Sequence, residues 1–153
     1  MTTGAYVVIA AVVFALAFGL RRRHTDGRFA ETDPRAIQDT QDETVTDSLL
    51  AGTPWEAELG ERATLVQFSS AFCAPCRTTR VVLADVADHH DGVRHVEVDA
   101  EKHLDLVRAL HVTRTPTTIV LDPHGRELGR AAGAPTREQV LRSLPGTQDG
   151  GHR

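Results

Sequence analysis

The 153-residue chain has only two cysteines, and aromatic residues make up just 5% of it. With so few cysteines, the fold cannot depend on the disulfide framework that stabilises many small secreted proteins. A formal net charge of −4 and the scarcity of aromatic rings argue against a surface that binds nucleic acid. The sequence contains no internal repeat and no phosphate-binding glycine loop. Its hydrophobic content of 41% is enough for one domain with a single core.

Charge is also absent from the first twenty residues, which are almost wholly apolar from residue 5 onward. A helix of about twenty residues rises about 30 Å, enough to cross the hydrocarbon core of a bilayer. A cleaved secretory signal has its positive charge before the apolar region, whereas the arginine triplet at residues 21–23 follows it. We therefore expect residues 1–20 to be an uncleaved transmembrane anchor.

The basic residues also predict which side of the cell membrane the chain occupies. Lys and Arg are enriched in the cytoplasmic flanks of membrane spans. Here the arginine triplet and Arg28 follow the apolar segment, and no Lys or Arg precedes it. We expect a single-pass protein whose folded domain faces the cytoplasm, with an extracytoplasmic domain as the alternative.

The next segment has a composition unlike that of a folded domain. Residues 21–47 are a basic flank followed by a polar, acidic stretch, which is typical of a flexible linker. A short helix over residues 36–41 is the alternative. The folded domain is expected over residues 48–145, with Trp55 as a packing residue, and residues 146–153 are expected to form a disordered tail.

The two cysteines, Cys73 and Cys76, lie between an expected strand and an expected helix. Residues 63–68 are β-branched and apolar like a buried strand, and residues 77–86 carry apolar side chains at helical spacing. At a helix N-terminus, unpaired backbone N–H groups and the helix dipole lower the pKa of a thiol below about 8.5. We therefore expect Cys73 to be a redox nucleophile.

Cys76 is expected to be the resolving thiol. It lies within the first helical turn, where it can attack a mixed disulfide formed on Cys73. Pro75 suits this turn because its missing N–H costs little there. A zinc site is an alternative, but it needs about four ligands and the pair supplies only two. A purely structural disulfide is another, but so short a loop constrains the unfolded chain little. Redox exchange without a metal or other cofactor is favoured.

Beyond the cysteines, expected strands and helices alternate. The pattern predicts strands over residues 93–99, 117–121 and 127–131 and helices over residues 104–110 and 136–144. Thr136 is the expected N-cap of the last helix, with Glu138 or Gln139 near its first turn. This alternation is typical of an α/β fold with a central mixed sheet.

From about residue 50 to residue 145 the chain resembles the thioredoxin family. The resemblance rests on Phe68, the Phe-Cys-Ala-Pro-Cys motif at residues 72–76, Val98, Asp99, residues 114–117 and Gly133. It implies a thioredoxin-like fold, in which a central mixed β-sheet is flanked by helices, here preceded by the transmembrane helix.

The resemblance also implies a surface that contacts substrates. In the family, the proline corresponding to Pro116 is cis and lies beside the cysteines, and the backbone of the preceding residue, here Thr115, pairs with an extended substrate. An ordinary trans proline is the alternative reading of the residues alone. Phe72, Ala74 and Pro75 complete the expected contact surface. Thioredoxins usually have Trp in place of Phe72 and Gly in place of Ala74, so this surface is altered.

The most consequential departure from the family is Gln67. Many thioredoxins have a buried acidic residue there, which helps to move a proton at the resolving cysteine. Gln67 can form hydrogen bonds but cannot act as a general base near neutral pH. His95 falls where the lysine partner of that acid commonly lies, so a pair formed by Gln67 and His95 is expected to replace the charged one. The alternative is that His95 is an ordinary strand residue.

Together these features predict a membrane-tethered thiol–disulfide oxidoreductase that reduces disulfides in partner proteins. The sequence does not identify its electron donor. A cytoplasmic location favours reduction, because that compartment keeps thiols reduced. The alternatives are an extracytoplasmic protein for cytochrome maturation or disulfide isomerisation, and a thioredoxin-fold binding module without catalysis. No glutathione-binding pattern is recognisable, which argues against glutaredoxin-type activity.

Overall fold

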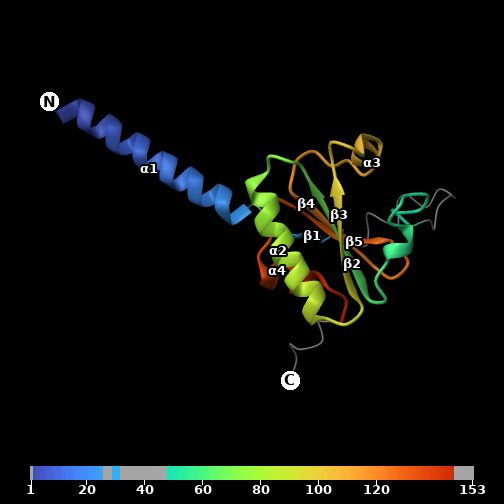
Figure 1. Ribbon diagram of the computed structural model, residues 1–153. Coiled ribbons are helices and arrows are strands. Elements are labelled where there is room, and N and C mark those ends of the chain that lie inside the picture. The colour runs from blue at the N-terminus through green and yellow to red at the C-terminus, as the bar shows by residue number, and fades with distance from the viewer. Residues whose placement is uncertain (1, 26–28, 32–47, 147–153) are drawn as a thin grey trace, which may run out of the picture.

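The computed structural model describes residues 2–25, 29–31 and 48–146 and shows a five-stranded sheet flanked by helices (Figure 1). The strands are β1 (Phe29–Glu31), β2 (Ala63–Ser69), β3 (Val93–Asp99), β4 (Thr117–Leu121) and β5 (Glu127–Ala132). The helices are α1 (Thr2–Thr25), α2 (Ala74–His89), α3 (Leu104–Ala109) and α4 (Arg137–Ser143), with a short 3-10 helix, η1 (Glu56–Glu58).

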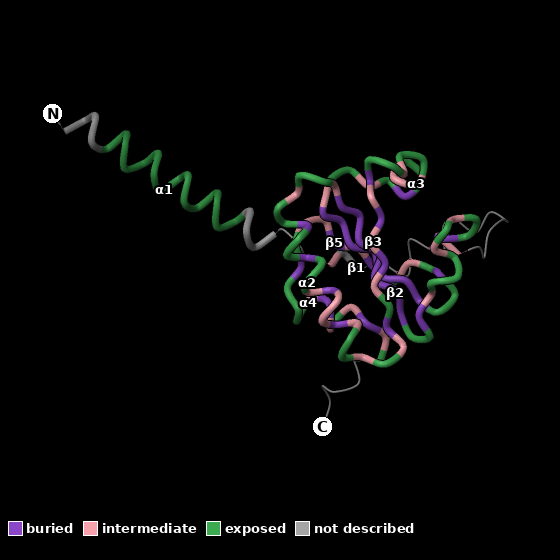
Figure 2. The backbone as a smooth tube through the Cα atoms, viewed as in Figure 1, coloured by how far each residue is buried: buried purple, intermediate pink, exposed green. Residues whose placement is uncertain are grey.

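The sheet is mixed, as the sequence predicts. Its strand order is β1-β5-β4-β2-β3, with β2 and β3 parallel and the other neighbouring pairs antiparallel. All seven residues of β2 are buried, because both faces of this strand are covered (Figure 2). The alternation of side chains along β2 divides the core into two clusters. Leu65 packs with residues of α2 and α4, whereas Val66 and Phe68 pack on the opposite face with Leu50.

The helices form where the sequence predicts them. In α2, Leu83 and Val86 are three residues apart and face the sheet, as the helical spacing of apolar residues requires. Thr136 is the N-cap of α4 and forms a capping box with Gln139, which confirms that prediction. Trp55 packs against the core and meets the ring of His103 edge-on, with ring centroids 4.7 Å apart.

The N-terminal region departs from the expected linker over residues 21–47. Helix α1 continues to Thr25, and β1 pairs with β5 inside that range. The physical reason is Phe29, an apolar residue that packs against the core cluster beneath α2 and α4. Residues 32–47, including the alternative helix over 36–41, and residues 147–153 of the expected tail lie outside the described residues.

Helix α1 projects away from the sheet (Figure 1). Its described side chains, residues 6–21, are all exposed, and they include Tyr6, Ile9, Phe14 and Phe18 (Figure 2). Among the residues that the structure describes, no helix has the length and apolar character needed to span a membrane. The expected transmembrane helix is therefore seen as a helix but is not confirmed as a span.

Candidate active site

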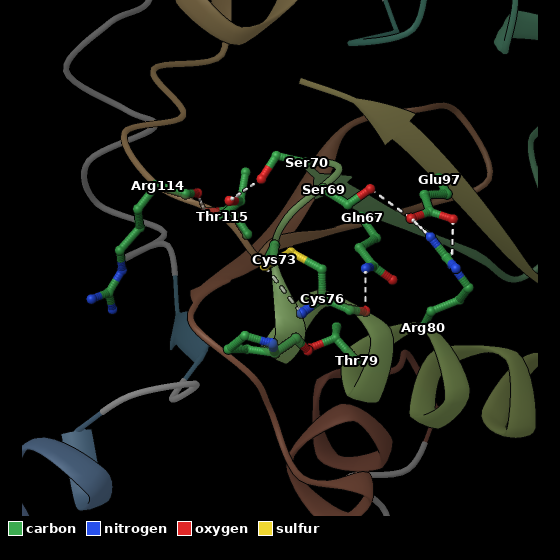
Figure 3. Close-up of a disulfide and its surroundings, with 12 residues drawn as sticks. Gln67, Ser69, Ser70, Cys73, Cys76, Thr79, Arg80, Glu97, Arg114 and Thr115 are labelled. Atoms are coloured by element: carbon green, nitrogen blue, oxygen red, sulfur yellow. Dashed lines mark hydrogen bonds and ion pairs between the residues drawn. A yellow bond between two sulfur atoms is a disulfide. The ribbon is translucent and has the colours of Figure 1, made fainter. Parts of the chain in front are cut away.

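The two cysteines lie where β2 passes into α2, as the sequence predicts. Cys73 is the N-cap residue of α2, and its Sγ accepts a hydrogen bond from the backbone N–H of Cys76 at 3.1 Å. The two form a disulfide, with their Cα atoms 5.2 Å apart (Figure 3). The open first turn of α2 therefore directs backbone N–H groups at Cys73, which is the arrangement that stabilises a thiolate.

The two sulfur-bearing residues differ in their access to solvent. Cys73 is half-buried, whereas Cys76 is only 1% exposed. Ala74 and Pro75 between them are exposed, with Pro75 in the first turn of the helix. Phe72 is 98% exposed and stands immediately before the pair. A partner disulfide can therefore reach Cys73 beside an apolar ring, while Cys76 lies behind it.

The Thr115–Pro116 peptide bond is cis, which confirms that prediction. Pro116 is buried and its carbonyl accepts a hydrogen bond of 2.8 Å from the N–H of Gly133. Thr115 lies on the loop beside the disulfide, and its Oγ1 is 3.2 Å from the Oγ of Ser70 (Figure 3). Ser70 thus links the cysteine loop to the Thr115 loop, a connection that the sequence analysis missed.

Gln67 and His95 form the expected pair. The buried Gln67 donates from Nε2 to the carbonyl oxygen of Cys76 at 2.9 Å (Figure 3). Its Oε1 lies 3.2 Å from Nε2 of His95. Because Oε1 can only accept, His95 has its proton on Nε2 in this arrangement. Burial lowers the pKa of His95, Glu97 opposes that effect, and Arg80 adds to it. Gln67, the side chain behind the resolving cysteine, is therefore uncharged and hydrogen-bonded on both sides.

A charged cluster at the rim of the site was missed by the sequence analysis. Glu97 accepts hydrogen bonds from Ser69 and from the guanidinium of Arg80, which lies one helical turn after Cys76. The Arg80 hydrogen bond is the main cause of the lowered pKa of Glu97. These three residues line a polar pocket together with both cysteines. The signal available in the sequence was the four-residue spacing of Arg80 from the resolving cysteine, beside a strand that carries an acid.

The chain matches the model of a known protein family over the residues that form the site. The thioredoxin family model matches residues 48–145, which contain the cysteine pair, the cis proline and strands β2 to β5 of the sheet. The chain belongs to the thioredoxin family. Its redox pair is therefore the centre of a thioredoxin-family thiol–disulfide oxidoreductase.

Individual relatives agree with this assignment. The chain is 30% identical over 77 residues to a thioredoxin of Mycoplasma genitalium, covering 50% of this chain and 74% of that protein. It is 32% identical over 79 residues to thioredoxin H2 of Arabidopsis thaliana, covering 52% of this chain and 59% of that protein. The solved structure of Fasciola hepatica thioredoxin superposes with a TM-score of 0.50 at 24% identity, covering 57% of this chain and 82% of that one. This last likeness concerns the fold alone.

The difference in burial predicts the order in which the reduced thiols react. Cys73 should be alkylated at least about tenfold faster than Cys76, because it is accessible and lies at the helix N-terminus. Iodoacetamide labelling across pH, followed by peptide mapping, measures the two rates. Cys76→Ser should keep the fast rate and Cys73→Ser should lose it. Faster labelling of Cys76 would reverse the assigned roles.

The buried environment of His95 predicts a pH dependence of stability. Its pKa in the folded state is lowered, so below about pH 6.5 the unfolded chain takes up a proton that the folded chain does not. The free energy of unfolding should therefore fall as the pH drops below about 6.5. His95→Gln removes the effect, which amounts to at most about 1.4 kcal/mol per pH unit.

Urea unfolding of both proteins between pH 5 and pH 8 checks this prediction. His124→Gln is the matched control, because the side chain of His124 is exposed. Equal pH dependence in the wild type and the His95→Gln variant would show that His95 is not held neutral by the fold.

Proposed function

We propose that this protein is a membrane-tethered reductase of protein disulfides. The observation that carries the catalytic part is the asymmetry of the disulfide: Cys73 is accessible at the helix N-terminus, and Cys76 is buried within its first turn. A binding module without catalysis needs neither two cysteines nor this difference between them. Phe72 immediately precedes Cys73, and Ser70 links the cysteine loop to the loop that carries Thr115 and the cis Pro116. These residues are the proposed surface for an extended partner.

The exchange proceeds in two steps. The thiolate of Cys73 attacks one sulfur of the partner disulfide, so that a mixed disulfide forms and the other partner sulfur leaves as a thiolate. The thiolate of Cys76 then attacks Sγ of Cys73, which releases the second partner thiolate and leaves the Cys73–Cys76 disulfide. Two electrons pass from the pair to the partner. A dithiol donor, which the chain does not identify, must then reduce the pair again.

The tethering part of the proposal rests on the composition and surface of α1. Its side chains from Tyr6 to Leu20 are exposed and mostly apolar, and they surround the helix on all sides. Water is a poor environment for such a helix, whereas a bilayer stabilises it. The proposed span covers residues 1–20, and the side chains of residues 1–5 lie outside those that the structure describes.

The direction of the reaction follows from the proposed side of the membrane. The arginine triplet at residues 21–23 follows the apolar segment, which favours a cytoplasmic domain. The cytoplasmic thiol pool holds such pairs reduced, so electrons flow from Cys73 and Cys76 to partner disulfides.

Substitution of each cysteine tests the proposed exchange. Cys73→Ser should lower the rate at which a peptide disulfide is reduced by at least about a hundredfold, because the attacking sulfur is lost. Cys76→Ser should instead accumulate mixed disulfides with partner proteins in membranes, which non-reducing electrophoresis detects. Reduction that persists in Cys73→Ser would contradict the proposed mechanism.

Thiol labelling of intact cells tests the proposed location. A membrane-impermeant maleimide should leave Cys73 unlabelled until the membrane is opened, because the domain is on the inner side. A variant without residues 1–20 should leave the membrane fraction and serves as the control for tethering. Labelling of Cys73 in intact cells would place the domain outside and support a role in cytochrome maturation or disulfide isomerisation.

A further inference from the structure

The short strand β1 determines from which end of the sheet the N-terminal helix leaves. Phe29 is paired with Ala131 near the end of β5, in an antiparallel register. Two residues further along, the N–H of Gly133 donates to the carbonyl of Pro116, on the loop beside the disulfide. The first residue of β1 therefore lies at the active-site end of the sheet, and β1 runs away from it.

A short link ties the end of helix α1 to this end of the sheet. Three residues separate Thr25 from Phe29, so the ends of α1 and β1 are at most about 14 Å apart. From β1 to β2 there are three strand spacings, which amount to about 14 Å. The disulfide is therefore within about 30 Å of the end of α1.

The docking of β1 limits how far the domain can turn relative to α1. Phe29 is packed against the core cluster below α2 and α4, and backbone pairing with β5 holds the strand. A parallel β1 on the same edge would have brought α1 to the opposite end of the sheet. A long flexible tether would have allowed every orientation.

We propose that β1 orients the domain so that Cys73 faces the membrane surface, and that the substrates are disulfides of membrane proteins close to that surface. This inference rests on the membrane tethering proposed above. Phe72, 98% exposed beside Cys73, then points toward apolar segments at the membrane interface. Disulfides of partners that reach far from the bilayer are disfavoured because the docked β1 limits how far the domain can turn toward them.

The test uses the full chain reconstituted in phosphatidylcholine vesicles with two probe peptides. Each probe is a transmembrane peptide with a disulfide-linked fluorophore, placed either two residues from the span or beyond a helical spacer of about 45 Å. Each rate is divided by the rate of the same protein variant on a soluble peptide disulfide, which removes differences in intrinsic activity. The near probe should be reduced at least about tenfold faster than the far probe.

Two insertions of the same twenty Gly and Ser residues provide matched variants. An insertion between Thr25 and Phe29 separates α1 from β1 by a coil of about 25 Å, so the preference for the near probe should fall at least about fivefold. The same insertion after residue 40 lies downstream of β1 and should leave the preference unchanged. Equal rates on both probes in the wild type, or equal preferences in all three proteins, would overturn the inference.

Flotation of the vesicles distinguishes an absent preference for the near probe from failure of the tether. A chain that floats with the vesicles but shows no preference overturns only the orientation by β1. A chain that does not float overturns the tether and this inference with it.

Discussion

The junction between β2 and α2 is the constraint on which the rest of the site depends. Because β2 is buried on both faces, it cannot shift without disturbing both core clusters, and it therefore fixes the position of Cys73. The hydrogen bond from the N–H of Cys76 to Sγ of Cys73 then places the second sulfur inside the first helical turn. Cys73 and Cys76 have the same side chain, so the difference in their reactivity comes from their positions at the N-terminus of α2.

The electrostatics behind this junction differ from those expected of a thioredoxin with a buried acid. Gln67 satisfies its polar atoms with the carbonyl of Cys76 and with His95, so no buried charge needs compensation. The charged groups lie instead at the rim, where Glu97 and Arg80 form an ion pair near solvent. The uncharged Gln67 positions Cys76 through a hydrogen bond, but it cannot accept the proton of the Cys76 thiol. The proton must therefore leave by way of solvent or of a group at the rim.

The sequence was sufficient for the parts of this structure that arise from local periodicity and spacing. A continuous run of β-branched and apolar residues located β2, and the position of the cysteines before an amphipathic helix located the site. The pairing of Gln67 with His95 followed from the resemblance to the family. The sequence did not reveal β1, because a three-residue strand in a polar segment has too short a pattern. The contact of Ser70 with Thr115 was also hidden, since it joins loops 45 residues apart.

The docking of β1 also affects the solubility of the domain. Without it, β5 would present a row of unpaired backbone N–H and C=O groups, which is a template for pairing with a second chain. The charged residues of β5 protect this edge only in part, because Arg130 and Glu127 are half-buried and Arg130 is engaged with Glu127 and the carbonyl of Leu110. A fragment trimmed to the family-matched residues 48–145 would lack β1 and expose that edge. Strand β1 thus covers a sheet edge that would otherwise favour aggregation.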